Sequence, residues 1–383
     1  MAGLAVKRYP LRVVSENPNP PVADQSVPIS EQAGQARPNE GRARLHKLLA
    51  KQLRNFTILF ARTLAEEDAD TVHDLRVCTR RLQQILTALV PEKNLSKARS
   101  VRRTLRRVRR ALGSWRNCDV ALQWVVRHER RASKPARKSG WRLVRESIAA
   151  ERQEAIEGAR RKLYKADGVT LAHRVQQLLA LGQDRLGGAD PHAVVRTAVA
   201  DAAAQWRQAL ERAQADRSVQ NIHALRIRTK RLRYWVELAR DLGCSQVSAL
   251  IGWFKLMQDR LGRWHDRQEL GRFITRALAN SDVLIAQPAV AVELLREVEK
   301  DLKISSREVE ELFRLATQSE GARQLQRWLQ SYCAASARET AAPAGDGATP
   351  IEPPPSASTQ STAGPQTSQQ PQSSDEADEE VRN

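Results

Sequence analysis

The chain has 383 residues, of which 41% are hydrophobic, so it holds enough apolar side chains to form a sizeable core. Its 63 lysines and arginines exceed its 44 aspartates and glutamates, and the net charge of +19 points to an acidic partner such as nucleic acid, membrane lipid or polyphosphate. No apolar run approaches the length of a membrane span, the N-terminus lacks a signal segment, and the four cysteines lack zinc-site spacing. The sequence therefore predicts a cytoplasmic protein without a membrane or metal partner.

Both ends of the chain differ in composition from its centre. Residues 1–40 contain six prolines and show no lasting periodicity, which predicts a disordered leader. Residues 337–383 are rich in Ala, Pro, Ser, Gln and Thr and end in SSDEADEEVRN, which predicts a disordered acidic low-complexity tail. Because the leader is neutral and the tail carries −6, the segment 41–336 carries about +25 and is more basic than the whole chain.

The centre of the chain shows helical periodicity almost throughout. Proline is scarce there, strand-like alternation is absent, and Ala, Leu, Arg, Glu and Gln dominate. The predicted fold class is therefore all-α. The expected helices cover 42–66, 70–90, 96–112, 118–133, 139–164, 168–186, 191–214, 218–242, 246–261, 266–279, 288–315 and 320–335.

One half of this helical segment repeats the other. HDLRVCTRRL at 73–82 returns 150 residues later as HALRIRTKRL at 223–232, and LGSW at 112–115 returns as LGRW at 261–264. We interpret 41–188 and 189–336 as a tandem duplication that forms two pseudo-symmetric helical bundles. The matching apolar positions between these motifs are Val101, Leu105, Val108 and Leu112 in the first copy and Leu250, Phe254, Met257 and Leu261 in the second.

A glycine follows the third helix in each copy, and we expect Gly113 and Gly262 to stop that helix. Shortly after Gly113 come Arg116 and Asp119, which either place a charge at the mouth of a groove or pair with one another. The tryptophans beside these glycines are expected to be packing anchors: Trp115 and Trp264.

The repeated motif places a cationic stripe opposite an apolar face when it is drawn at 100° per residue. An ordinary solvated face mixes charges of both signs, whereas these stripes are nearly of one sign and recur in both copies, so we expect them to bind an anion. Arg81 and Arg231 lie off to one side and are expected to serve a flank. The third helix of the first copy contains further arginines, including Arg102 and Arg106, and no acidic residue. The corresponding helix of the second copy is less basic, and its Lys255 matches Arg106. The stripe residues are His73, Arg76, Arg80, His223, Arg226, Lys230 and Arg233.

Phosphate is the anion that this pattern of side chains fits best. Arginine presents a planar fork to two phosphate oxygens, and lysine acts as a point charge, so a row of them matches a chain of repeating phosphates. By analogy with nucleic acids, such binding should weaken steeply with salt. His73 and His223 lie near the starts of their helices, where free backbone N–H groups also favour anions. A bound phosphate favours the protonated imidazole, which predicts tighter binding at lower pH.

The two copies resemble the CHAD domain, the conserved histidine α-helical domain. Its motif stands as HDLRVCTRRLQQ at 73–84 with LGSWRNCDV at 112–120, and as HALRIRTKRLRY at 223–234 with LGRWHDRQEL at 261–270. The resemblance implies two helical bundles around a basic groove or pore that binds inorganic polyphosphate, often at polyphosphate granules, with no catalytic centre and no cofactor. Together with the third helix and the groove mouth, the predicted polyphosphate-binding residues are His73, Arg76, Arg80, Arg81, Arg102, Arg106, Arg116, His223, Arg226, Lys230, Arg231, Arg233 and Lys255.

The sequence departs from the family pattern at a few positions. Gln83 replaces the usual arginine, Asn117 replaces the usual aspartate, and the second copy lacks the final Asp-Val pair. Relatives often carry a neighbouring triphosphate-tunnel (CYTH) domain with an alternating Glu-x-Glu-x-Lys strand. No such strand occurs here and residues 1–40 are too few for that barrel, so we expect a stand-alone CHAD protein.

Three other functions stay open at this stage. A nucleic-acid binder would have the same charge, although aromatics make up only 4% of the chain and no zinc finger or RNA-recognition motif occurs. A phosphohydrolase would need a Walker motif, an HExxH sequence or clustered carboxylates, and none is visible. A scaffold that recruits other granule proteins would use the ends of the chain as handles.

Overall fold

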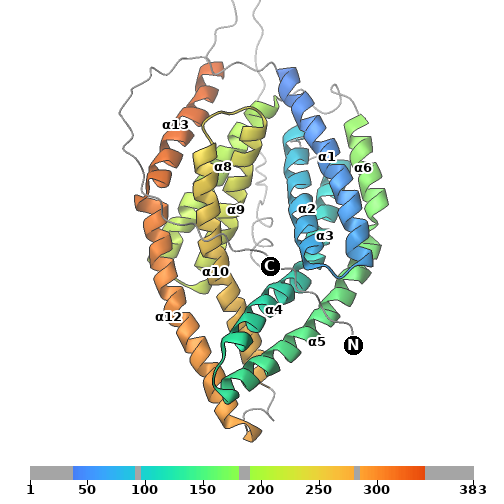
Figure 1. Ribbon diagram of the computed structural model, residues 1–383. Helices are drawn as coiled ribbons and strands as arrows, with labels where there is room; N and C mark the ends of the chain where they lie inside the picture. Colours follow the sequence, from blue (N-terminus) through green and yellow to red (C-terminus); the bar gives the residue numbers. More distant parts are fainter. Residues whose placement is uncertain (1–37, 91–95, 181–189, 280–284, 341–383) are drawn as a thin grey trace, which may run out of the picture. The chain divides into compact units, whose positions relative to one another are not determined.

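The computed structural model describes residues 38–90, 96–180, 190–279 and 285–340, and all of the regular secondary structure in these ranges is helical. This confirms the predicted all-α fold class. The helices of the first half are α1 (Pro38–Ala65), α2 (Ala69–Leu89), α3 (Ser96–Ala111), α4 (Gly113–Arg131), α5 (Pro135–Ala166) and α6 (Gly168–Ala180). Those of the second half are α8 (Pro191–Ala215), α9 (Val219–Asp241), α10 (Ser248–Leu278), α12 (Pro288–Gln318) and α13 (Glu320–Thr340), as Figure 1 shows.

Helix starts repeat along with the sequence motifs. The side chain of Asp68 accepts a hydrogen bond from Thr71 N (2.9 Å) and begins α2, while the hydroxyl of Ser218 accepts one from Asn221 N (3.4 Å) and begins α9. Each cap satisfies a backbone N–H group that has no partner within its helix. The two caps are 150 residues apart, which is the offset of the repeated motif.

The order of helices follows the predicted duplication. α1, α2, α5 and α6 correspond in order to α8, α9, α12 and α13, and their starting residues differ by 150 to 153. α3 and α4 together correspond to the single helix α10. The pseudo-twofold symmetry between the two halves stays a prediction.

The two glycines behave differently. α3 ends at Ala111 and α4 begins at Gly113, as expected. The prediction was wrong for Gly262, which lies inside α10. A glycine in a helix interior costs only about 1 kcal/mol relative to alanine, and the buried side chains on both sides of Gly262 hold α10 continuous.

The apolar positions of both copies form the core. The eight matched positions of the third helices are each at most 1% exposed, and Trp115 and Trp264 are buried as expected. A larger cluster joins the apolar faces of α1, α2, α3, α8, α9 and α10, and a smaller one joins α4 and α5 to the end of α10 and the start of α12. α2 lies next to α8 and α9, and α10 packs against α4 and α5, so the two copies meet along these helices (Figure 1).

The helical part of the chain slightly exceeds the predicted core of 41–336, because α1 begins at Pro38 and helix α13 runs to Thr340. The rest of the predicted leader and tail, 1–37 and 341–383, lies outside the described residues. Among the described helices, none combines the length and the apolar character needed to cross a bilayer. Cys78 and Cys118 are buried thiols, and burial raises the pKa of each to about 12.

Candidate functional site

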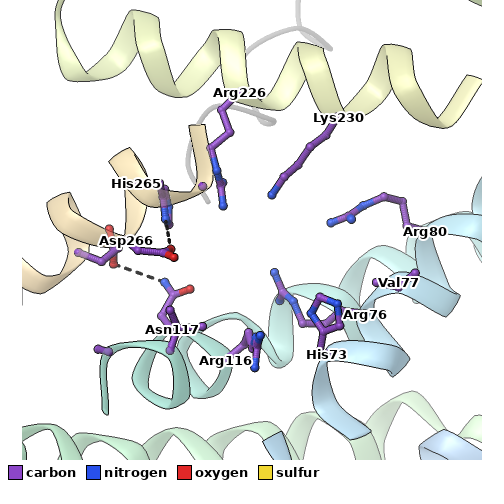
Figure 2. A pocket seen from close by; sticks show the side chains of 14 residues that line it. His73, Arg76, Val77, Arg80, Arg116, Asn117, Arg226, Lys230, His265 and Asp266 are labelled. Atoms are coloured by element: carbon purple, nitrogen blue, oxygen red, sulfur yellow. Dashed lines mark hydrogen bonds and ion pairs between the residues drawn. The ribbon is translucent and has the colours of Figure 1, made fainter. Parts of the chain in front are cut away.

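A cavity of about 220 Å³ lies where α2 and α4 of the first copy face α9 and α10 of the second (Figure 2). We call it the basic cavity. Residues three or four apart on a helix share a face, so each helix supplies a short run of side chains at that spacing. The lining residues are His73, Arg76, Val77 and Arg80 from α2, Arg116, Asn117, Val120 and Ala121 from α4, Arg226 and Lys230 from α9, and Gly262, His265, Asp266 and Glu269 from α10.

α2 supplies the cationic stripe that the sequence predicts. Arg76 Nη1 donates a hydrogen bond to the carbonyl oxygen of Arg109 at 2.6 Å, which fixes the guanidinium at the cavity wall. Burial and the positive charge of Arg80 lower the pKa of Arg76 to about 10. Partial burial and the charge of Arg116 also lower the pKa of His73. The free cavity therefore disfavours the charged forms of its own cations.

α9 supplies Arg226 and Lys230, whose side chains point into the cavity opposite Arg76 and Arg80 in Figure 2. Burial lowers the pKa of both. For Lys230 the lowering is large, because the charges of Arg226, Arg80 and Arg76 add to the effect of burial. Cations from both copies thus repel one another across a shared space.

Tyr234 connects the two stripes. Its hydroxyl accepts a hydrogen bond from Arg80 Nη1, which links α9 to α2. The guanidinium carbons of Arg80 and Arg233 each lie 5.0 Å from the centroid of the tyrosine ring, within the range of cation–π attraction. Tyr234 therefore positions Arg80 toward the cavity. This tyrosine is the last residue of the second copy's motif HALRIRTKRLRY, and its contact with the first copy was not predicted.

The histidines of the two copies do not occupy equivalent places. His73 lines the cavity, whereas His223 does not and instead packs against His265, with ring centroids 5.6 Å apart. Burial, followed by the charge of His265, lowers the pKa of His223 to about 4. The structure thus places His73 at the cavity and His223 behind His265, and the binding role of His223 stays a prediction. Sequence reasoning missed His265, although an offset of 149 residues aligns it with Arg116.

One end of the cavity carries carboxylates. Asn117 Nδ2 donates to Glu269 Oε2 at 3.4 Å, and His265 Nδ1 lies 3.5 Å from Asp266 Oδ1. Arg272 Nη1 also donates to Glu269 Oε1 at 2.7 Å. None of the five lining cations forms an ion pair with a carboxylate of the described residues: Arg76, Arg80, Arg116, Arg226 and Lys230. Five lining cations thus face two lining carboxylates, and the cavity keeps a net positive charge.

The structure decides between the two alternatives for Arg116 and Asp119. Arg116 lines the cavity and its Nη1 donates to the carbonyl oxygen of Ala69 at 3.4 Å. Asp119 is buried and accepts a hydrogen bond from Arg152 Nε at 2.7 Å. Burial raises the pKa of Asp119 although Arg152 opposes this. Arg116 therefore places its charge at the cavity, and Asp119 pairs with another helix.

Several residues predicted for the groove lie outside this cavity. Arg81, Arg231 and Lys255 are exposed, and Arg231 Nη1 donates to Gln205 Oε1 at 3.2 Å. Arg233 forms an ion pair with Glu237 at 3.5 Å. A helical projection gives the direction in which a side chain leaves its helix. Whether that direction leads to the cavity or to solvent depends on how the helix packs against its neighbours.

Two predicted residues of the third helix also lie outside the cavity. Arg102 Nη2 donates to the carbonyl oxygens of Leu86 and Val90, where it caps the C-terminus of α2. Arg106 is half-buried on the same side of α3. Within the described ranges, no group of three or more His, Cys, Asp or Glu side chains has the arrangement of a metal site.

The fold and the cavity define an all-helical protein that gathers cations from two similar sets of helices around one space. Residues 47–275 match the family model described as the CHAD domain, and the chain belongs to that family. The fold is similar to the crystal structure of the CHAD domain from the plant Ricinus communis, with a TM-score of 0.52 and 20% sequence identity over 70% of this chain and 91% of that one. No curated protein matches the chain. The resemblance and the all-α fold expected from the sequence are thus confirmed.

Proposed function

We propose that the basic cavity binds inorganic polyphosphate. The observation that carries the proposal is the convergence of five cationic side chains from α2, α4 and α9 on one space without a carboxylate partner among the described residues. Like charges held together in this way destabilise the free protein, and a polyanion that enters the cavity offsets that cost. Membership of the CHAD family supports the same ligand.

The side chains suit phosphate in particular. Four of the five cations are arginines, whose forked N–H groups match pairs of phosphate oxygens, and Lys230 adds a point charge. They come from opposite sides of the cavity, so successive phosphates of one chain can contact both copies. We also propose that the protein associates with polyphosphate granules in the cytoplasm, where this ligand is concentrated.

As part of the same proposal, the cavity holds its ligand without cleaving it. The two carboxylates at its end are already engaged, Glu269 by Asn117 and Arg272, and Asp266 by His265. The groups that face the centre of the cavity are cations, which stabilise bound phosphate in its ground state. Such uniform binding gives affinity rather than rate acceleration.

The test compares two triple variants of the full chain that lose the same charge. The cavity variant replaces Arg80, Arg226 and Lys230 by glutamine, and the matched control replaces the exposed Arg81, Arg231 and Lys255 by glutamine. Each charge-assisted contact contributes about tenfold in affinity, so we expect about a thousandfold loss for the cavity variant in a polyphosphate titration at physiological salt. The control should stay within about threefold of wild type, since exposed charges are screened.

Equal losses in the two variants would contradict the cavity as the site. A competition assay addresses the nucleic-acid alternative. DNA that displaces polyphosphate at equal charge concentration would favour a nucleic-acid binder and overturn the proposal. Release of phosphate from polyphosphate by wild type, but not by the cavity variant, would instead show an enzyme.

A further inference from the structure

A row of arginines continues from the basic cavity along α3. Arg102, Arg106 and Arg109 are spaced four and three residues apart, so they share one side of the helix, and we call them the α3 row. All three are half-buried, whereas Arg103, Arg107 and Arg110 on the other side of α3 are exposed. The contacts of Arg102 and Arg109 with α2 show that this side of α3 faces α2.

The α3 row joins the cavity at its wall. Arg76 lines the cavity and donates to the backbone carbonyl of Arg109 at 2.6 Å, and the side chain of Arg109 donates from Nη1 to Gln83 Oε1 at 3.0 Å. Gln83 follows Arg80 by one turn on the same face of α2. Arg109 therefore lies beside Arg76 at the cavity wall, and the row begins at this point.

Two of the three arginines in the row, Arg102 and Arg106, have no carboxylate partner among the described residues. α3 itself contains no acidic residue. Burial, and then the charge of Arg106, lower the pKa of Arg102. A partly buried row of like charges costs stability, which a bound polyanion offsets.

The second copy lacks this feature. At the offset of 149 residues that aligns the third helices, Arg102 corresponds to Ile251, which is buried, and Arg109 corresponds to Gln258. Only Lys255, which is exposed, keeps the charge of its counterpart Arg106. The extension is thus restricted to one side of the cavity.

We propose that the α3 row is a second binding segment, over which a long polyphosphate chain continues after it leaves the basic cavity through the first copy. This inference rests on the proposed function of the cavity. The row adds about 10 Å along α3, since its ends are seven residues apart at about 1.5 Å per residue. Short polyphosphates are held by the cavity alone, whereas long ones gain the additional contacts, so the protein distinguishes chain length.

The experiment uses the full chain with two probes, tripolyphosphate and a long polyphosphate. The test variant R106Q/R109Q removes two charges of the row and keeps Arg102, which caps α2. The matched control R103Q/R107Q removes two exposed charges from the other side of the same helix. For the test variant we expect about tenfold weaker binding of long polyphosphate and a salt dependence reduced by about two counterions. Tripolyphosphate affinity should stay within about twofold, and the control should bind both probes like wild type.

The possible results separate this inference from the function on which it rests. If wild type binds neither probe, the proposed function fails and the extension fails with it. If the cavity binds both probes but R106Q/R109Q binds long polyphosphate as well as the control does, only the extension is wrong. An equal loss for both probes would make the row a support of the cavity rather than an extension.

Discussion

Lys230 offers a test of the idea that the free cavity is electrostatically strained. Its ammonium group faces Arg226, Arg80 and Arg76, and it forms no ion pair with the described residues. Burial and these three charges lower its pKa well below the usual value of 10.5. Replacing Lys230 by methionine keeps the length and volume of the side chain and removes the charge.

We expect K230M to stabilise the free protein by about 1–2 kcal/mol, in the range typical of substitutions that relieve a functional strain. The cavity is open to water, so the gain stays below the cost of a fully buried charge. For a helical core of about 300 residues, each kcal/mol raises the Tm by about 1–2 °C. The same substitution removes a phosphate contact and weakens polyphosphate binding about tenfold.

The stability gain from K230M changes with pH in a defined direction. Because the pKa of Lys230 is lowered by folding, the unfolded chain binds this proton more tightly than the folded one. The destabilisation by Lys230 is therefore complete below its folded pKa and disappears as the pH approaches 10.5. The advantage of K230M should shrink as the pH rises from the lowered pKa of Lys230 toward its usual value of 10.5.

Thermal unfolding followed by circular dichroism measures these effects, with and without polyphosphate. At a ligand concentration about 100 times the Kd, wild type gains about 2.7 kcal/mol, and K230M gains less. The control is K255M, which removes an exposed lysine outside the cavity and should leave both quantities unchanged. A Tm for free K230M equal to or below that of wild type would refute the reasoning.

Two further predictions concern a histidine and a buried ion pair. Partial burial and a neighbouring arginine lower the pKa of His73, and bound phosphate favours its protonated form, so polyphosphate affinity should rise as the pH falls from about 8 to about 6. H73Q should flatten this rise in a binding titration, whereas substitution of the exposed His173 by glutamine should preserve it. Without ligand, lower pH has the opposite effect, on stability. As the pH falls, His73 takes up its proton in the unfolded chain before it does in the folded one, so the free energy of unfolding decreases below pH 6.5. D119N should lower the free energy of unfolding by about 1–3 kcal/mol in a denaturant titration, because it leaves Arg152 without its buried partner at 2.7 Å. E157Q, in an exposed pair, should cost less than about 0.5 kcal/mol, and equal losses would contradict this account.

Much of the fold could be predicted because its signals are local. The apolar spacing of the third helices predicted the buried positions of α3 and α10, such as Leu105 and Phe254. The interruption at Gly113 was predicted correctly and the one at Gly262 was not, since the two positions have the same local signal. The packing of buried residues on both sides of Gly262 outweighs the low helix propensity of glycine. The local sequence around Gly262 does not indicate this packing.

The candidate site was only partly predictable. Arg76, Arg80 and Lys230 were chosen because their side chains project away from an apolar face, and the structure brings them to one cavity. Arg231 satisfied the charge criterion equally well but lies outside. Asp266 was not predicted, because its place in the cavity lining depends on which part of α10 faces α4.

The sequence by itself determined that the protein is all-helical, that its helices carry repeated motifs, and which side of each motif helix is cationic. These properties follow from a period of 3.6 residues and from side chains near one another in the chain. The tertiary structure alone decided that His265 rather than His223 lines the cavity and that Tyr234 holds Arg80 across the two copies. These contacts join residues more than 40 positions apart, because burial of the apolar faces sets how far each helix is rotated toward its neighbours.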